Sequence, residues 1–332
     1  MKAIKLASVF AVTAVAAAVS TATFAADAII TGEAGVEYVQ YHGSASDTKG
    51  DTADGTDLGE LELHVDTGIV YAELEFKTTG EDEGTDINME KLYVKQGAVS
   101  FGRFDGSVAT GAFMGMDEIF GGVDTRDNRV VNKETDNTGI RYKVTPEFTV
   151  AVEASGSRNV RVSKAAVTAG GVVVTPAVTS QEKIDSEIGV ALSYVKDFGV
   201  VKLGVSAGAI GDTNAYNIGA QTTVGMATIS ANYGAGKTID DVDTDSSSAT
   251  TDVEQAQINI ALAVTDALTL TYEYARDLEN SGKAGKADHV DATYFIAEYA
   301  VGDLTYYYKN YNGDAELNSD IGKNIVGVKV FF

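Results

Sequence analysis

Apolar and polar residues alternate with a period of two along most of this chain. In the segment 69–77 every even-numbered residue is apolar, whereas Glu73, Glu75 and Lys77 hold odd-numbered positions. Because successive side chains of a strand face opposite sides of a sheet, this pattern predicts a strand with one apolar and one ionic face. The same alternation predicts about sixteen strands: 28–41, 57–66, 69–79, 87–96, 98–104, 138–144, 147–155, 186–196, 199–208, 215–223, 225–233, 253–263, 266–276, 289–300, 303–311 and 323–332.

The connections between these segments alternate in length. Tight links such as Asp66-Thr67-Gly68, Thr145-Pro146 and Gly302-Asp303 stand at every second junction. The junctions between them are long, and most are acidic and rich in small polar residues: 42–56, 105–137, 156–185, 234–252, 277–288 and 312–322. A soluble β-sandwich also alternates along its strands, but it has no reason to sort its connections by length. Short turns on one rim and long loops on the other are typical of a transmembrane antiparallel β-barrel with periplasmic turns and extracellular loops.

The C-terminus supports the same interpretation. The chain ends inside an alternating segment, in which the even-numbered residues from Val326 to Phe332 are apolar. A frayed apolar terminus is a liability in a soluble protein, but a barrel pairs its last strand with its first, here 28–41. Aromatic residues beside two tight turns predict an aromatic girdle at the level of Phe332: Tyr142, Phe148, Tyr194 and Phe198.

The first residues have the features of a secretory signal peptide. Lys2 and Lys5 precede an apolar, alanine-rich run, and Thr23-Phe24-Ala25 is a small-x-small cleavage site. We expect export and cleavage, which makes 1–25 a signal peptide and 26–332 a single barrel domain. Beyond this segment no stretch approaches the roughly 20 apolar residues of a spanning helix, so the mature chain can cross a membrane only as strands.

Charge and composition narrow the possible chemistry. The formal charge of −23 repels phosphate backbones, which argues against nucleic acid as a partner. The chain has no cysteine, which excludes disulfides and thiolate catalysis. Because His42, His64 and His289 are scattered, we predict no metal site, no cofactor and no enzyme activity. The run 231–238 fits a relaxed phosphate-loop pattern, but acidic residues rather than a helix follow it, so we interpret it as a strand end.

Three local motifs carry a resemblance to a known family. They are the turn Gln96-Gly97 leading into Val99-Ser100-Phe101-Gly102-Arg103, the run Asp136-Asn137-Thr138-Gly139-Ile140-Arg141-Tyr142, and the terminal Phe332. With the signal peptide, they make the whole chain resemble the Gram-negative general porins, which are trimeric 16-stranded diffusion pores of the outer membrane. The resemblance implies a homotrimer, insertion by the barrel-assembly machinery through the Phe332 terminus, and a third loop, 105–137, folded into the lumen. The loop departs from the enteric members, since Glu118-Ile119-Phe120-Gly121-Gly122 only partly matches their Pro-Glu-Phe-Gly-Gly segment.

A pore acts through the width and fixed charges of a water-filled constriction. The predicted loop supplies acidic and basic candidates: Asp105, Asp117, Glu118, Asp124, Arg126, Asp127 and Arg129. By the resemblance, the acidic part of the loop faces a basic barrel wall: Arg103, Arg141, Lys91 and Lys95. The alternative is that the loop charges are solvated, or form a salt-bridged clamp that fixes the loop. Most other lumen-facing charges are acidic, which predicts a modest cation preference: Glu33, Glu37, Glu60, Glu62, Asp66, Glu73, Glu75, Glu153, Glu273 and Glu298.

The predicted partners are small hydrophilic solutes, outer-membrane lipid and lipopolysaccharide. Acidic loops within 47–57, 81–86 and 240–245 could bridge divalent cations to lipopolysaccharide phosphates, although solvated loops are the simpler interpretation. Two other functions stay open. A substrate-specific channel, for oligosaccharides for example, would need pore-lining aromatics such as Tyr71 and Tyr93. A closed barrel would serve as an adhesin or structural anchor.

Overall fold

The computed structural model describes most of the chain as strands and turns. The described residues are 27–42, 51–53, 59–79, 84–104, 106–110, 138–154, 158–164, 167–169, 172–175, 178–184, 187–211, 213–239, 250–278, 291–314 and 319–332. Within these ranges there is no helix long and apolar enough to cross a membrane. The expected signal peptide 1–25 lies outside the described residues, as do Asp105 and positions 111–137 of the predicted constriction loop.

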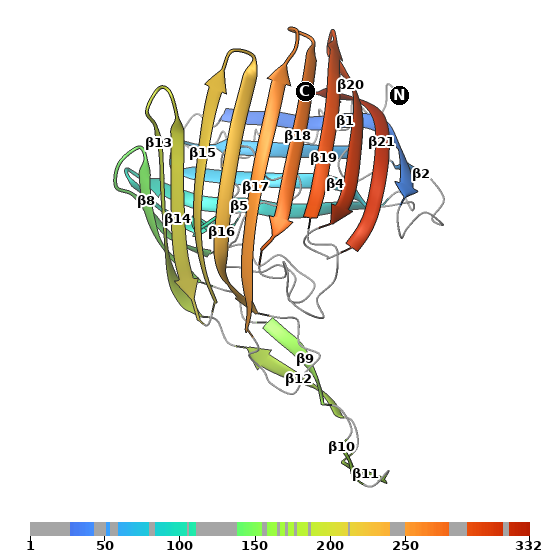
Figure 1. The fold of residues 1–332 in the computed structure, drawn as a ribbon. Helices are drawn as coiled ribbons and strands as arrows, with labels where there is room; N and C mark the ends of the chain where they lie inside the picture. Colours follow the sequence, from blue (N-terminus) through green and yellow to red (C-terminus); the bar gives the residue numbers. More distant parts are fainter. Residues whose placement is uncertain are drawn as a thin grey trace.

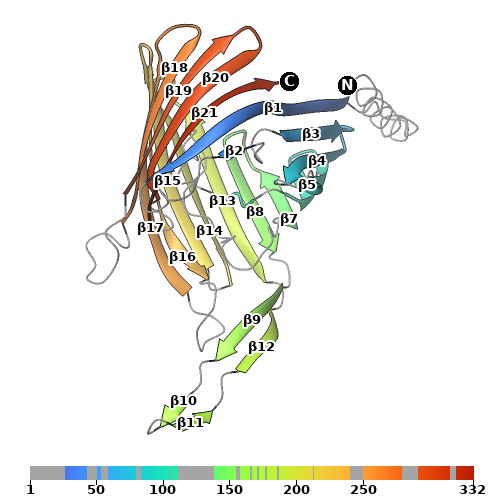
Figure 2. The same ribbon diagram turned by 90° about the vertical axis from the view of Figure 1, so that its right-hand side faces the viewer.

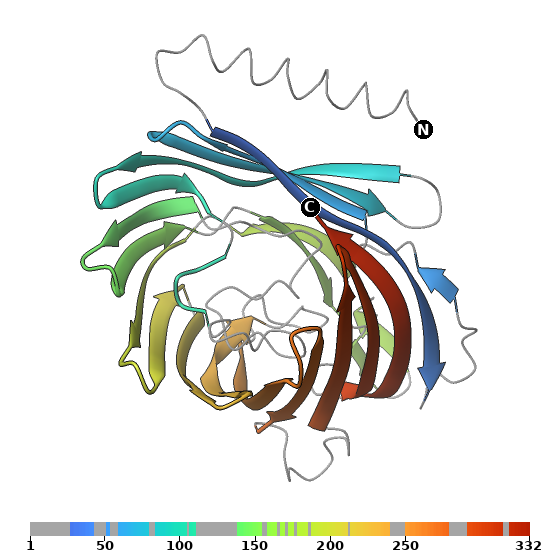
Figure 3. The same ribbon diagram turned by 90° about the horizontal axis from the view of Figure 1, so that it is seen from above.

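Sixteen strands form a closed antiparallel barrel. Figure 3 shows the ring along its axis, and Figure 1 shows it from the side. The barrel strands are β1 (Asp27–His42), β3 (Gly59–Asp66), β4 (Val70–Thr79), β5 (Gly84–Gln96), β6 (Val99–Arg103), β7 (Thr138–Lys143), β8 (Phe148–Ala154), β13 (Ile188–Asp197), β14 (Lys202–Ile210), β15 (Thr213–Val224), β16 (Ala227–Ile239), β17 (Thr250–Ala263), β18 (Leu268–Asp277), β19 (Asp291–Val301), β20 (Leu304–Asp314) and β21 (Ser319–Phe331). Each predicted segment corresponds, in order, to one of these strands, so the predicted fold class is confirmed.

The last strand closes the barrel on the first, as predicted. The register of β21 on β1 runs from Glu33 opposite Phe331 to His42 opposite Gly322. The backbone amide of Phe332 donates to the Gly32 carbonyl at 3.0 Å, and the Gly32 amide donates back at 3.0 Å. The N-terminal half of β1 pairs with β3 instead, so this long strand joins the two ends of the sheet.

Threonines stabilise three short turns of one rim in the same way. In the turns after β3, β7 and β17, the hydroxyls of Thr67, Thr145 and Thr265 accept hydrogen bonds from the amide three residues later, at 2.8, 3.1 and 3.0 Å. This local bond offers a nearby acceptor to the amide at the end of the turn, which is why threonine recurs there. Hydrogen bonding by the Thr145 side chain also lowers the pKa of the Glu147 carboxyl, which favours the charged form of this one carboxylate.

The opposite rim differs from the prediction in two respects. Strands extend into predicted loops: β16 continues to Ile239, and β17 begins at Thr250. The run 231–238 lies within β16, which supports its interpretation as strand rather than phosphate loop. The junction between β14 and β15 holds only residues 211–212, so long loops do not stand at every second junction and that expectation was wrong there.

Short strands also occur inside two predicted loops. In 156–185, β9 (Arg158–Lys164) pairs with β12 (Val178–Ile184), and β10 (Val167–Ala169) pairs with β11 (Val172–Thr175). Figures 1 and 2 show this arm projecting beyond the barrel rim. In 42–56, β2 (Asp51–Ala53) adds to β1.

The barrel is apolar outside and polar inside. On β13, Ile188 is 75% exposed on the outer surface, and the residue after it, Gly189, is buried. On β18, the carboxylate residue Glu273 is fully buried within the barrel at 0% exposure. The buried polar residues of the barrel strands are Glu37, Glu73, Glu75, Glu153, Ser206, Thr213, Asn217, Ser230, Asn232, Gln255, Gln257, Asn259, Glu273 and Asp277. A soluble protein has the reverse polarity, so this distribution fits a barrel surrounded by lipid.

Candidate permeation site on the inner wall

The segment 106–110, which follows β6, lies against the inner wall of the barrel. The buried Glu153 carboxylate of β8 accepts hydrogen bonds from the Ser107 hydroxyl at 2.6 Å and the Val108 amide at 2.9 Å. The Ala109 amide donates to the Ser107 hydroxyl at 3.0 Å, which tightens the same turn. This part of the predicted third loop is therefore attached inside the barrel.

Two further strands hold the segment. Arg141 of β7 donates from Nη2 to the Gly106 carbonyl at 2.7 Å, and its guanidinium lies 4.0 Å from the centre of the Phe104 ring. The same Nη2 is 3.8 Å from a Glu153 oxygen. On β14, the Ser206 hydroxyl donates to the Thr110 carbonyl at 2.7 Å. Arg141, which we predicted as a charge of the pore wall, thus also fixes the segment.

The predicted lysines of the wall each have an acidic partner. On β5, the Lys91 ammonium lies 2.5 Å from Glu73 of β4. Lys95 lies 2.6 Å from Asp66 at the end of β3. Arg103 pairs with Leu92 across the sheet, and it lies two residues after Phe101 on the same strand. Leu92 and Phe101 are both exposed on the outer face, so the backbone places Arg103 on that face too. The register thus favours Lys91, Lys95 and Arg141 over Arg103 as lumen residues.

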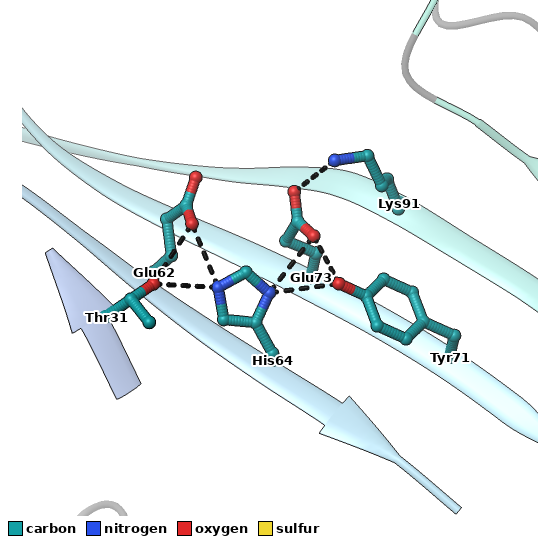
Figure 4. A network of polar contacts seen from close by, with 6 residues as sticks. All are labelled: Thr31, Glu62, His64, Tyr71, Glu73 and Lys91. Atoms are coloured by element: carbon teal, nitrogen blue, oxygen red, sulfur yellow. Dashed lines mark hydrogen bonds and ion pairs between the residues drawn. The ribbon is translucent and has the colours of Figure 1, made fainter. Parts of the chain in front are cut away.

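A polar network extends from Lys91 across four strands (Figure 4). His64 of β3 lies between two carboxylates: its Nε2 is 2.9 Å from Glu62, and its Nδ1 is 3.1 Å from Glu73. The Thr31 hydroxyl of β1 is 2.8 Å from the same Nε2. On β4, the Tyr71 hydroxyl donates to Glu73 at 2.5 Å. Sequence reasoning missed this site, although the tight turn after β3 pairs His64 with Glu73.

The network could in principle hold a metal ion, since ligand atoms of Glu62, His64 and Glu73 lie within 4.8 Å of one another. However, the two carboxylates face different nitrogens of the imidazole ring. A metal ion bound to one ring nitrogen would therefore lie beside only one of the two carboxylates. Glu73 is also paired with Lys91. The arrangement therefore fits a hydrogen-bonded imidazole better than a metal centre.

Aromatic rings border the same part of the lumen. Tyr71 stacks on Tyr93 with the ring centres 5.2 Å apart, and Tyr93 stacks on Phe104 at 4.8 Å. A cavity of about 470 Å³ lies beside them, and Lys91, Tyr93, Phe104, Ser107, Arg141 and Lys143 are among its lining residues. The alternation along the strands predicts that Tyr71 and Tyr93 line the lumen. It does not predict the same for Phe104, because the position of Phe104 depends on the path of the chain after β6.

Charged and uncharged residues occupy different walls. The strands β1 to β8 carry the ionic groups described above, and Glu33 of β1 pairs with Lys329 of β21 at 3.1 Å. The strands β14 to β17 present buried hydroxyl and amide residues instead: Ser206, Asn217, Ser230, Asn232, Gln255, Gln257 and Asn259. The predicted loop charges, Asp105, Asp117, Glu118, Asp124, Arg126, Asp127 and Arg129, lie outside the described residues.

Comparison with known proteins identifies the fold. No protein-family model matches the sequence, and no curated protein matches it. Among solved structures, Salmonella typhi OmpF in complex with daunomycin is similar with a TM-score of 0.59 and 12% identity, over 92% of this chain and 97% of that one. A mutant of the Rhodobacter blastica porin is similar with a TM-score of 0.53 and 13% identity, over 92% and 100%.

A third barrel extends the comparison to another genus. The outer-membrane expressed OmpT of Vibrio cholerae is similar with a TM-score of 0.54 and 13% identity, over 92% of this chain and 98% of that one. The alignments therefore span nearly the whole barrel in each case. The protein has the fold of the bacterial porins.

Proposed function

We propose that this protein is an outer-membrane porin through which small hydrophilic solutes and ions diffuse passively. The observation that carries the proposal is the inverted polarity of a closed barrel, apolar outside and polar inside, with residues 106–110 held against the inner wall. The outer surface suits lipid, and the inner surface suits water. Export through the signal peptide 1–25 would deliver the chain, and the strand ending at Phe332 would be recognised during barrel assembly.

The constriction would form where 105–137 enters the lumen. Its acidic and basic residues would face Lys91, Lys95 and Arg141 and set a transverse field across the opening. The hydrogen bonds of residues 106–110 to β7, β8 and β14 support this placement, because they direct the chain inward rather than over the rim.

Planar-bilayer recording tests the channel. We expect stepwise currents from the purified protein, and we expect the levels in groups of three if the proposed homotrimer inserts as a unit. Protein that folds into vesicles, as judged by its strand content, and passes no current would refute the channel. Single equal steps would refute only the trimer.

Selectivity is expected to favour cations modestly. On the described inner wall, Lys91 and Lys95 are each paired with a carboxylate, of Glu73 and of Asp66, and the buried charged residues of the barrel strands are all acidic. One unit charge about 8 Å from the ion path in water changes the local ion energy by roughly 0.5 kcal/mol, so we expect a K⁺ to Cl⁻ permeability ratio of a few-fold. Reversal potentials in a KCl gradient measure it, and a ratio below one would contradict the proposal.

The lining aromatics favour general diffusion over a specific sugar channel. A stacking track must offer free ring faces to a sugar. Here one face of Phe104 lies on Tyr93 and Arg141 lies over the ring, and Tyr93 is also stacked on Tyr71. Saturable block of the current by an oligosaccharide would favour the specific channel instead.

Three acidic segments of the sequence suggest a further partner. Divalent cations held by segments within 47–57, 81–86 and 240–245 would bridge the barrel to lipopolysaccharide phosphates. These contacts would anchor the barrel in the outer leaflet without affecting the pore.

A further inference from the structure

The His64 imidazole occupies an unusual position on the lumen wall. Its two nitrogens point to carboxylates on opposite sides of the ring, to Glu62 at 2.9 Å and to Glu73 at 3.1 Å (Figure 4). Two hydroxyls complete its surroundings, that of Thr31 at 2.8 Å from Nε2 and that of Tyr71 at 3.0 Å from Nδ1.

A neutral imidazole cannot satisfy both carboxylates. It carries one N–H, and its other nitrogen is a bare acceptor. Either tautomer therefore leaves a carboxylate oxygen of Glu62 or Glu73 about 3 Å from a lone pair, which is repulsive. The protonated ring donates from both nitrogens, and the observed geometry then contains two charge-assisted hydrogen bonds.

The two carboxylates differ in their freedom to move when the ring loses its proton. The Glu73 side chain is 6% exposed, and Lys91 and Tyr71 hold it in place. The Glu62 side chain is 30% exposed, and within the described part of the chain it is held, apart from His64, by a hydrogen bond from the Thr31 hydroxyl at 3.2 Å. Deprotonation should therefore release Glu62 into the lumen while Glu73 stays.

We propose that His64 is a proton-controlled selectivity residue of the channel. The inference rests on the proposed diffusion function and adds its regulation. The charged groups facing the ring are Glu62 from β3 itself and Glu73 from β4, with Lys91 of β5 paired to Glu73; β1 contributes the uncharged Thr31. With the ring protonated, this set is neutral. With the ring neutral, it carries one negative charge, on the carboxylate that is free to move.

The set lies where its charge should matter. Lys91 lines the cavity beside Phe104 and Ser107, and Glu62 lines a second cavity, of about 430 Å³, together with Thr31, Glu33 and Phe332. A carboxylate released from this part of the inner wall attracts cations and repels anions along the ion path. The neighbouring charges at the turn, Asp66 and Lys95, are paired with each other and contribute a fixed background.

Reversal potentials in a KCl gradient at about pH 5.5 and about pH 8 test the proposal, because histidine is the side chain that ordinarily changes charge in this window. We expect the K⁺ to Cl⁻ permeability ratio of the wild type to rise about twofold between the two values. His64→Gln should abolish this rise. His42→Gln is the matched control, since His42 lies at the far end of β1 outside the network, and it should retain the rise.

The outcomes separate this inference from the channel itself. A conducting wild type whose ratio is constant, or a His64→Gln variant that keeps the rise, would overturn the role of His64 and leave the channel intact. A barrel that does not conduct would refute the channel, and NMR of labelled protein in detergent would then decide the network. As the pH is raised, the Glu62 carboxyl signal is expected to change together with the His64 ring signal. A Glu62 signal that stays the same when the ring loses its proton would overturn the proposed link between His64 and Glu62.

Discussion

Ile218→Arg is expected to lower the free energy of unfolding of the barrel in lipid vesicles by about 2–4 kcal/mol. Ile218 lies in the middle of β15 and is 55% exposed on the outer face. In water, replacing so exposed a residue by arginine would change stability by only about 0.5 kcal/mol. In a bilayer the guanidinium would have to enter hydrocarbon, which is costly near the midplane and much less so at the interface.

Val224→Arg provides the matched control on the same strand and the same face. Val224 is 66% exposed but ends β15 at the short-turn rim, where water and headgroups can solvate an arginine. We expect a loss of no more than about 1 kcal/mol there. Urea titrations of both variants folded into vesicles measure the difference. Equal, small losses would mean that the middle of the outer face does not contact lipid.

The strands were predictable because each has one buried and one exposed face. Where that contrast weakens, the prediction weakens too. The alternation predicts a loop at the end of β16, because the residues from Gly234 to Gly236 are small and small residues produce no alternation in hydrophobicity. The ladder still pairs them with β15 and β17, because backbone hydrogen bonds do not depend on side-chain size.

The candidate site was predictable only where its contacts are local in the sheet. The pairing of His64 with Glu73 follows from the register of one hairpin, and the partner of Lys91 follows from the next. The contacts that hold 106–110 join residues far apart in sequence, as between Ser107 and Glu153 or between Ser206 and Thr110. These contacts depend on how the chain turns inward after β6. The alternation of apolar and polar residues along the strands does not predict that turn.

Glu153 is expected to be the main support of that inward segment. Its carboxylate accepts from both Ser107 and Val108 and is buried beside Arg141. Glu153→Ala removes both hydrogen bonds, each worth about 0.5–1.5 kcal/mol, and leaves two donors without their acceptor. The ratio of molecules with the segment 106–110 bound to the inner wall to molecules with it detached should then fall by roughly ten- to a hundredfold.

Single-channel recording should show this release directly. Because an undocked segment no longer narrows the lumen, we expect Glu153→Ala to give larger and noisier conductance steps than the wild type. Glu147→Ala is the matched control, since Glu147 lies in the tight turn that precedes the same strand, and its steps should equal those of the wild type. Ser206→Ala removes the bond to Thr110, together with a bond that Ser206 accepts from Asn217, and should give an intermediate effect because the Glu153 bonds remain. Steps of unchanged size and noise in Glu153→Ala would show that this carboxylate does not hold the segment, and that the lumen is narrowed by other contacts.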